Sequence, residues 1–252
     1  MNTLPNGSLH GEEAISSLNA EVTLDIIPEA VDSQKGVSVK YVQSSGSDWY
    51  VLRASYGREV KVRDILLGLG LYAHVAERYE MKIVKGKRKK VLVSLLPNLV
   101  FAYMPKDQAD FYIKGPSPAF IKSNSEKEAE DRVPEDFLRS VIELSMLASF
   151  YYNHFERDEN DGEKNPPLTI QEREMLSFIR ATCTKSVHLK NVDLQKCRFL
   201  DGQMVEVIKG DYMGVRGRMA RVAGQQCIVV SLANGKWNIS TDYIPTPFIR
   251  PL

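Results

Sequence analysis

The sequence predicts an α+β protein in which an N-terminal α/β sandwich with an antiparallel sheet is followed by a small all-β barrel. Two observations lead to this prediction. From Asp48 to Cys183, β-prone runs alternate with runs whose apolar residues recur at helical spacing. The last 54 residues instead contain short β-patterned runs such as "GVRGRMARV" and "QCIVVSL", which are typical of a small barrel.

The first elements follow from local patterns. Residues 1–47 are rich in Ser, Gly, Asn and acids and predict a flexible extension, in which a single strand at the apolar patch Leu24-Asp25-Ile26-Ile27 stays open. Folded structure is expected to begin near Asp48. "WYVLRASY" predicts a strand, and "GREVKVRDILLGLG" predicts a helix with Gly70 as its C-terminal cap. "MKIV" and "VLVS" are β-prone and flank a glycine-containing turn, which predicts a hairpin.

The next elements complete an N-terminal domain over 48–183. "LLPNLVFAY" predicts a strand, after which the pattern lapses over 105–133, and this predicts an inserted loop. "PEDFLRSVIEL" predicts a helix and "LASFYYNHF" a strand. Thr169 and Glu172 have the spacing of a capping box at the start of the helix "IQEREMLSFIRAT".

The C-terminal part is expected to be a separate barrel over 199–252, joined to the first domain by a linker over 184–198. Four β-patterned runs follow one another there within a short stretch of chain. The pair Asn234-Gly235 predicts a type I′ hairpin between the last two runs.

Charge is unevenly distributed, although the formal net charge is only +1. Residues 1–47 carry six acids and two lysines, whereas the run from Arg78 to Lys90 carries seven bases and one acid. Five of these bases lie at the tip of the predicted hairpin, where they are exposed and can approach phosphates. Two interpretations stay open, namely contact with a polyanion and an ordinary solvated face.

Several classes of protein are not expected. No apolar run approaches the roughly 20 residues of a membrane span, and the N-terminus lacks a signal-peptide pattern, so a cytoplasmic protein without membrane contact is expected. Cys183, Cys197 and Cys227 lack metal-ligand spacing and are expected to be free thiols. The four histidines stand apart, although His154 in "YYNHF" is the best candidate for chemistry. No phosphate loop or nucleophile motif is present, so we expect no enzyme, no catalytic residue, no metal and no other cofactor.

The residues themselves resemble a known family. "WYVLRASYGRE", "IVKGKRKKV" and "LLPNLVFAY" resemble the N-terminal (NGN) domain of the NusG family, and "GQMVEVIKGDYMGVRGRMARV" resembles its KOW barrel. Among specialised members, "IVKGKR" ahead of "LPN" resembles RfaH, and "FYYNHF" with "NPPLTI" resembles UpxY-type antiterminators. The KOW glycines Gly210, Gly214 and Gly217 are expected in tight turns with positive φ, and they are specific only together with the preceding domain.

The resemblance implies a monomeric transcription elongation and antitermination factor that binds the clamp helices of the largest RNA polymerase subunit. It would suppress pausing or termination at particular operons, such as a capsular or surface-polysaccharide locus. The implied polymerase-binding residues are Trp49, Tyr50, Tyr56, Leu96, Pro97, Leu99 and Phe101. Leu96 and Leu99 replace aromatic residues common in the family. Because alternate strand residues face the core, about half of the set is expected to pack rather than bind, Tyr50 and Phe101 first among them.

The resemblance also implies contact with upstream or non-template DNA. The hairpin cations would screen phosphates without reading sequence, and Tyr56 with Arg58 would contact a flipped base, the alternative being that Arg58 is simply solvated. The implied DNA-binding residues are Tyr56, Arg58, Lys85, Lys87, Arg88, Lys89 and Lys90.

In the family, the KOW barrel recruits a second partner, which is Rho, a small-subunit ribosomal protein or nascent structured RNA. The residues implied here are Arg216, Arg218, Arg221 and Lys236, which form either an RNA-binding stripe or a strand face that keeps the protein soluble. A second function also stays open, a ribosome- or structured-RNA-binding KOW protein acting in translation. The acidic extension has no counterpart in the resemblance, and both masking of the basic hairpin and a passive tail are open.

Overall fold

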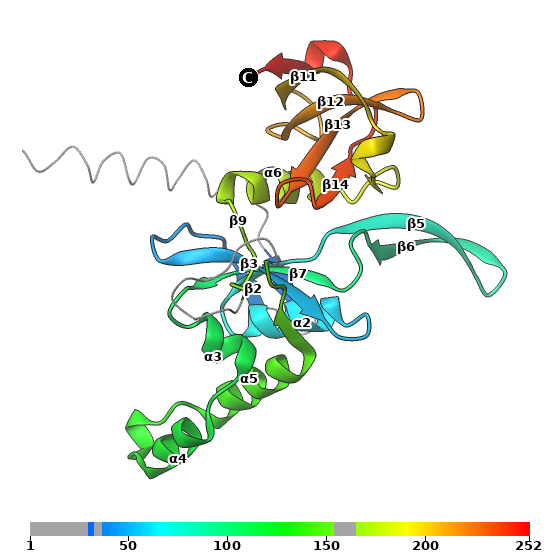
Figure 1. Cartoon of the computed structure of the whole chain (residues 1–252). Coiled ribbons are helices and arrows are strands. Elements are labelled where there is room, and N and C mark those ends of the chain that lie inside the picture. Colours follow the sequence, from blue (N-terminus) through cyan, green and yellow to red (C-terminus); the bar gives the residue numbers. More distant parts are fainter. Residues whose placement is uncertain (1–29, 33–36, 154–164) are drawn as a thin grey trace, which may run out of the picture.

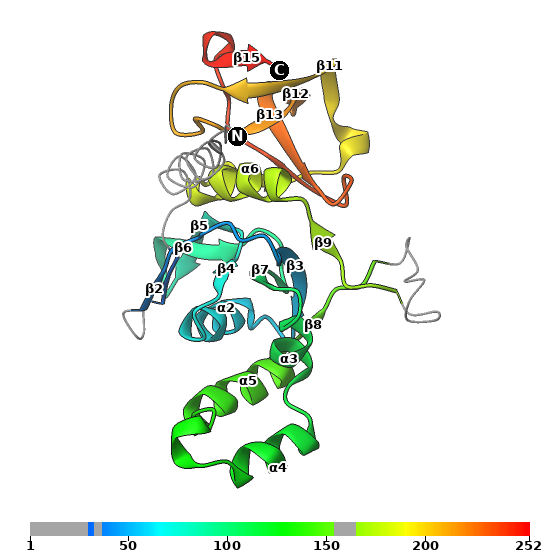
Figure 2. The same cartoon turned by 90° about the vertical axis from the view of Figure 1, so that its left-hand side faces the viewer.

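A computed structural model describes residues 30–32, 37–153 and 165–252 of the protein. The chain forms an N-terminal α/β part and a C-terminal sheet, and helix α6 (Glu172–Cys183) lies between them (Figures 1 and 2). The sheets are antiparallel and the C-terminal part is all-β apart from short 3-10 turns. The α+β fold class predicted from the sequence is therefore confirmed.

The N-terminal part is built on a sheet in the order β4-β7-β3-β8, with β9 also paired to β3. Its strands are β3 (Ser47–Ala54), β4 (Tyr72–His74), β7 (Leu99–Pro105), β8 (Ala148–Phe150) and β9 (Thr169–Ile170). Both faces of this sheet are covered. Leu52 and Val100 face helices α2 (Glu59–Gly68) and α5 (Glu135–Leu147), whereas Trp49 and Phe101 face α6. This explains why β7 is apolar throughout and why β3 is apolar at four successive positions, Trp49 to Leu52, instead of alternating.

Residues 105–133 contain helices, so the expectation of an inserted loop was wrong. The elements are α3 (Ala109–Lys114), α4 (Pro118–Glu126) and the 3-10 turn η1 (Ala129–Asp131), which with α5 extend away from the side of the sheet that α6 covers (Figure 1). The Ser117 hydroxyl accepts a hydrogen bond from the Phe120 amide at 3.1 Å, and Pro118 occupies the first turn of α4. A Ser-Pro pair can begin a helix as well as a turn, and here it begins a helix.

The fold also begins earlier than Asp48. Strand β1 (Ala30–Asp32) pairs with β2 (Val37–Val39), and the buried Tyr41 ring stacks on Trp49 with 5.5 Å between ring centroids. The Tyr41 hydroxyl donates to Glu172 at the start of α6. The hydrogen bonds between the Ser44 backbone and the Tyr103 hydroxyl also hold this segment against the core, and a composition argument cannot detect such contacts. The rest of the expected extension, 1–29 and 33–36, lies outside the described residues.

Helix α6 packs against both parts of the protein. Phe178 contacts Phe101 of β7, with 5.4 Å between ring centroids, and the Ser177 hydroxyl exchanges two 2.7 Å hydrogen bonds with the backbone of Arg216. The two parts therefore share one continuous hydrophobic core. The predicted capping box is wrong, because Gln171 precedes the first turn of α6 and Thr169 pairs with Tyr50 in the sheet.

The C-terminal sheet has the strand order β10-β14-β13-β12-β11-β15. Its strands are β10 (Lys190–Asn191), β11 (Arg198–Val207), β12 (Arg216–Val222), β13 (Gln225–Leu232), β14 (Trp237–Ser240) and β15 (Ile249–Pro251), with 3-10 turns η2 (Leu194–Lys196) and η3 (Thr246–Phe248). The expected linker over 184–198 contains β10 and the fully buried Leu189, so this sheet begins inside it. A linker composition does not exclude one short edge strand.

The turn prediction in this sheet was correct in place and wrong in type. Four residues join β13 to β14, because Leu232 pairs with Trp237. The two-residue turn with positive φ at both positions is Ala223-Gly224, between β12 and β13, with φ of 50° and 82°. These are the angles of a type I′ turn.

Candidate nucleic-acid and partner interface

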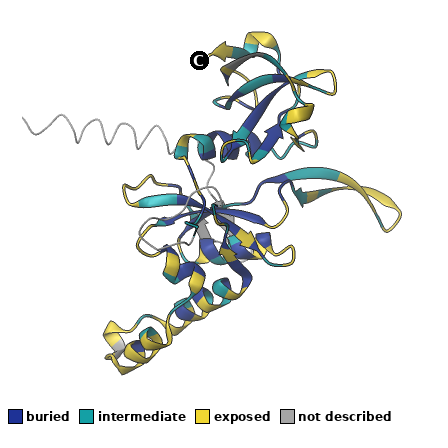
Figure 3. Cartoon of the chain, viewed as in Figure 1, coloured by how far each residue is buried: buried dark blue, intermediate teal, exposed yellow. Residues whose placement is uncertain are grey.

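The basic run forms the end of a projecting two-stranded hairpin, as the sequence predicted. Strands β5 (Glu77–Val84) and β6 (Lys87–Ser94) pair with each other, and the turn Lys85-Gly86 has φ of 51° and 75°. Positive φ at both turn positions gives the type I′ geometry that matches the twist of the strands. Figure 3 shows that the outer half of the hairpin is exposed, and Lys85, Lys87, Arg88, Lys89 and Lys90 are all solvent-exposed.

The two faces of the hairpin differ in composition. Residues that lie opposite each other in the register share a face. One face, here called the mixed face, contains Tyr79, Met81, Ile83, Arg88, Lys90 and Leu92. Three of its apolar side chains are open to solvent, since Met81 is 58%, Ile83 74% and Leu92 40% exposed. The other face contains Arg78, Glu80, Lys82, Lys87, Lys89 and the valines at 84, 91 and 93.

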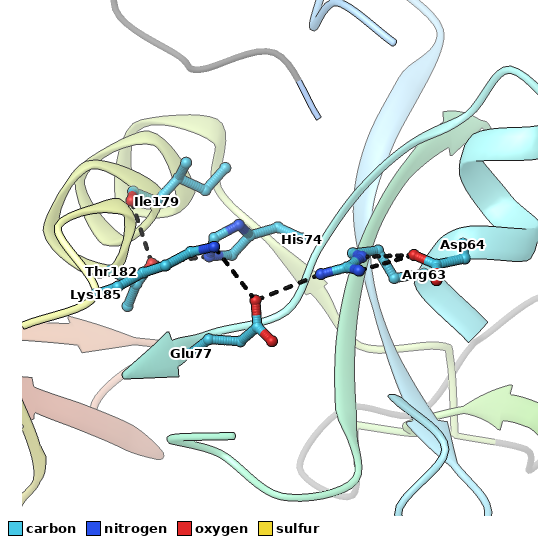
Figure 4. Close-up of polar contacts among 7 residues, drawn as sticks. All are labelled: Arg63, Asp64, His74, Glu77, Ile179, Thr182 and Lys185. Carbon is cyan, nitrogen blue, oxygen red and sulfur yellow. Dashed lines mark hydrogen bonds and ion pairs between the residues drawn. The ribbon is translucent and has the colours of Figure 1, made fainter. Parts of the chain in front are cut away.

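The base of the hairpin is fixed by an ionic cluster (Figure 4). The buried Glu77 carboxylate lies 3.4 Å from the Arg63 guanidinium of α2 and 3.8 Å from the Lys185 ammonium just beyond α6. The Tyr79 amide also donates to the Lys185 carbonyl at 3.1 Å. A carboxylate with two cationic partners is well compensated, so the cluster connects the hairpin to the helix layer and to the end of α6.

His74 lies beside this cluster and stays neutral. Burial, followed by the charges of Arg63 and Lys185, lowers the pKa of His74 from 6.5 to about 3. Its Nε2 atom is 2.8 Å from the Thr182 hydroxyl of α6, which itself donates to backbone carbonyls of the helix. His74 therefore acts as a packed polar contact between β4 and α6. His10 and His154 lie outside the described residues.

Two turns that are distant in the sequence lie together just beyond Ala54, the last residue of β3. Tyr56 and Gly57 have φ of 54° and 68°, and the Gly57 amide donates to the Asn98 side chain at 2.9 Å. The Asn98 carbonyl accepts from the Ala54 amide at 2.9 Å, and Asn98 itself has φ of 63°. Asn98 was not among the predicted site residues, although Asn is one of the few side chains that tolerate a left-handed backbone.

Tyr56 is the most exposed of the aromatic residues expected to contact a partner. Its side chain is 92% exposed, and the Arg58 guanidinium carbon lies 6.0 Å from its ring centroid. A bulky residue in the left-handed region carries a conformational cost, which such residues bear mainly at functional sites. Exposed Lys85 and Ala223 share the left-handed backbone, so the Tyr56 turn differs from them by the exposed aromatic ring that it presents.

Most of the residues implied in polymerase binding are buried. Trp49, Leu96, Leu99 and Phe101 belong to the core shared with α6 and the C-terminal sheet, and Tyr50 packs on the opposite face of the sheet against Phe150. None of these five residues is more than 7% exposed. Tyr56 and Pro97 are exposed, and the Asn98 contacts bring their two turns together.

The cations of the C-terminal sheet are not equivalent. Arg250 and Arg216 both form ion pairs with Glu206, at 2.6 and 3.1 Å, and these contacts lower the pKa of the Glu206 carboxyl. The Arg218 guanidinium lies over the Phe199 ring, 4.3 Å from its centroid. Arg221 is exposed, and the Lys236 ammonium lies 4.3 Å from the Tyr151 ring centroid. Arg216 and Arg218 share a face as expected, but Arg216 is committed to an ion pair.

The three glycines that the resemblance singled out, Gly210, Gly214 and Gly217, have two different structural roles. Gly210 and Gly214 have φ of 83° and 81°, as expected for tight turns. Gly217 does not have positive φ, so that part of the expectation was wrong. A Cβ atom at Gly217 would lie 2.5 Å from the Val229 carbonyl oxygen, so this glycine permits close approach of β12 and β13.

The hairpin, the Tyr56 turn and the Pro97 turn all belong to one contiguous segment of sequence. Residues 47–123 match the NusG family model. The description of that family is transcription termination factor NusG, and the match covers less than a third of the chain. The NusG-like region begins with β3 and includes α2, the hairpin and β7, and it ends within α4. The match supports a transcription factor of the NusG kind.

The other comparisons add little to the NusG match. No curated protein sequence matches the chain. A solved structure from a study of domain interaction in Thermotoga maritima NusG covers 82% of this chain and 97% of its own, at 14% identity and a TM-score of 0.33. A similarity of that size supports neither the arrangement of the two parts nor a function.

Two kinds of feature are absent from the described residues. None of the described helices is long and apolar enough to cross a membrane. Within the same residues, His, Cys, Asp and Glu side chains do not gather into a group that could hold a metal ion.

Proposed function

We propose that this protein is a NusG-like transcription elongation and antitermination factor that binds RNA polymerase and suppresses pausing or termination. The observation that carries the proposal is the joining of the strained, exposed Tyr56 turn to the Pro97-Asn98 turn, which follows directly from the basic hairpin, all inside the NusG-like region. One exposed aromatic anchor beside a rigid proline turn suits contact with an apolar helix surface.

The polymerase contact proposed here is narrower than the sequence implied. Of the seven residues implied, Tyr56 and Pro97 are accessible for the clamp helices in this arrangement of the chain. Trp49, Tyr50, Leu96, Leu99 and Phe101 support the contact from beneath, by fixing the strands that present both turns.

The hairpin cations form the proposed nucleic-acid contact, with upstream or non-template DNA as the ligand. Their five charges on an exposed tip attract phosphates without reading base sequence. Tyr56 is available to stack on an unpaired base, and Arg58 is close enough to its ring to join that contact.

The operon class and the second partner rest on the resemblance. The motifs "FYYNHF" and "NPPLTI" support a specialised factor whose operons include a capsular or surface-polysaccharide locus. Of the four cations that the resemblance implied in the C-terminal part, Arg218, Arg221 and Lys236 have no ion-pair partner in the described chain. They are the proposed contact for nascent RNA, Rho or a small-subunit ribosomal protein.

Transcription with purified cognate polymerase tests the proposal, with read-through of a pause or terminator as the measured quantity. The wild-type chain should increase read-through, and Tyr56→Ala should weaken polymerase binding by about ten- to a hundredfold, as expected for loss of an aromatic anchor. Replacement of Lys87, Arg88, Lys89 and Lys90 by alanine should reduce read-through and flatten its salt dependence.

A charge-matched control keeps the second variant interpretable. Replacing Lys40, Lys122, Lys127 and Arg139 by alanine removes the same four charges from exposed positions outside the hairpin. This control should leave read-through unchanged. A wild-type chain that neither binds polymerase nor alters read-through would reject the proposal, and co-sedimentation with ribosomes would then favour the role in translation.

A further inference from the structure

The exposed apolar side chains of the hairpin are unexplained by contact with phosphates. A polyanion requires cations, yet the mixed face also exposes Met81, Ile83 and Leu92 to solvent. Met81 lies opposite Lys90 and Ile83 lies opposite Arg88. Exposed apolar residues that gather on one face usually mark an interaction surface. The ligand of this face must therefore offer both apolar side chains and negative charge, which is the chemistry of an acidic protein segment.

Residues 1–29 of the same chain have this composition. They contain five acids, Glu12, Glu13, Glu21, Asp25 and Glu29, and neither lysine nor arginine. They also carry large aliphatic side chains, among them Ile15, Leu18, Val22, Leu24, Ile26 and Ile27. The hairpin has the opposite charge and a comparable apolar content, so the two are complementary in both respects.

The described fold places the end of this segment close to the hairpin base. Strand β1 begins at Ala30 and contacts β4 and α2, and β4 ends three residues before β5 begins. Each hairpin strand has eight residues, which is roughly 26 Å at the rise of a β-strand. A segment of 29 residues therefore has ample length to follow the hairpin from its base to its tip.

The hairpin also has backbone groups available for such a segment. Strands β5 and β6 form a two-stranded sheet, and within the described part of the chain neither outer edge is paired with another strand. An extended segment could donate and accept hydrogen bonds along one edge while its side chains contact the mixed face.

We propose that residues 1–29 dock on the mixed face of the hairpin and compete with nucleic acid for its cations. The docked segment shields Met81 and Ile83 from water and neutralises Arg88 and Lys90. Nucleic acid then binds the hairpin strongly only when it displaces the segment. The competition rests on the proposed function, whereas the docking itself does not.

Site-specific photo-crosslinking in the full chain tests the docking. With benzoyl-phenylalanine in place of Leu18, crosslinks should map to residues 79–92. The variant with Met81→Ser and Ile83→Ser should lose them by about tenfold, which corresponds to the loss of two apolar contacts. Circular dichroism and thermal unfolding verify that each variant is folded.

A matched control changes exposed apolar residues elsewhere. Ile142 and Met146 of α5 are 39% and 70% exposed, and their replacement by serine should leave the crosslinks in place. Crosslinks that map away from the hairpin, or that are equally strong in the Met81→Ser, Ile83→Ser variant, overturn the docking.

Fluorescence anisotropy with a labelled 20-mer DNA duplex and the matching single strand tests the competition in the full chain. Replacing the five acids of residues 1–29 by glutamine should tighten binding by about tenfold or more at low salt, and the gain should shrink as salt is added. Unchanged affinity overturns the competition.

The same measurement detects the alternative ligand for the mixed face. If Met81→Ser with Ile83→Ser weakens DNA binding while leaving the crosslinks intact, the mixed face belongs to nucleic acid and the inference falls. If the chain with an unmutated hairpin gives no crosslinks to residues 79–92 while read-through in transcription is normal, this inference alone is rejected and the proposed function stands.

Discussion

The sequence assigned both the hairpin and the apolar residues of β3 and β7 to contacts with a partner, yet the hairpin is exposed and the residues of β3 and β7 are mostly buried. Ile83 near the hairpin tip is 74% exposed, whereas Phe101 of β7 is fully buried. Both lie in β-prone runs next to a turn. The number of layers covering each strand, which is a tertiary property, decides which aromatic or aliphatic residue is available to a partner.

The difference has a simple structural cause. Strands β5 and β6 pair only with each other in the described chain and extend beyond the helices, so their outer halves have no covering layer (Figure 1). Strands β3 and β7 lie at the centre of the N-terminal sheet, with α2 and α5 on one face and α6 on the other. A cluster of charge in the sequence is a reliable indicator of an uncovered strand pair such as β5 and β6, because five clustered cations cannot be buried.

The largest expected effect comes from truncating a buried side chain of β7. Phe101→Ala removes a ring that contacts both Phe178 and Trp237, and it should lower the free energy of unfolding by about 3–5 kcal/mol. Ile83→Ala on the hairpin should change it by about 0.5 kcal/mol or less, as is usual for surface positions. Urea denaturation of both variants measures the contrast, and equal losses would mean that the hairpin is also packed in solution.

The neutral His74 is expected to give the next largest effect, which is a dependence of the protein's stability on pH. Its pKa of about 3 in the folded protein lies below the ordinary 6.5, so the folded state binds fewer protons and stability falls as the pH drops below 6.5. The slope from this group is at most about 1.4 kcal/mol per pH unit.

Stability curves of the wild type and His74→Gln measured between pH 7 and pH 4 test this assignment. The variant should be less stable at pH 7, because it disturbs the contact with Thr182, and the gap should narrow as the pH falls. A gap that is constant with pH would show that His74 accepts a proton without penalty in the folded state. Neutralising the hairpin lysines should not alter the slope in this range, since these side chains are exposed.

The sequence predicted the element types well where a pattern is local. The hairpin, its tip, helix α2 and strands β11 to β14 follow from alternation, helical spacing and turn residues, whereas the short edge strands β10 and β15 were not predicted. Gly70, expected after α2, has φ of 79° and follows the helix by two residues. These features depend on a few neighbouring residues, which is why one sequence is sufficient to predict them.

What the sequence could not predict depends on contacts between distant residues. Tyr41 joins the core only because Trp49, Tyr72 and Tyr103 surround it. Asn98 becomes part of the candidate site only because its side chain meets the Gly57 amide across 41 residues of sequence. The Ser177 contact with Arg216, which helps α6 join both parts of the protein, leaves no local signal at either position.

The smallest expected effect tests whether the strain at Tyr56 serves a contact. Tyr56→Gly should raise the free energy of unfolding by about 0.5–1 kcal/mol, because glycine adopts φ near 54° without a steric penalty, while read-through should fall. Ala223→Gly is the matched control, since Ala223 is exposed with φ of 50° in the turn between β12 and β13. The Ala223→Gly variant should gain a similar free energy of unfolding, and its read-through should be unchanged. If Tyr56→Gly keeps full read-through, the Tyr56 ring is not a contact, and the exposed turn has to be explained by the Gly57 to Asn98 hydrogen bond alone.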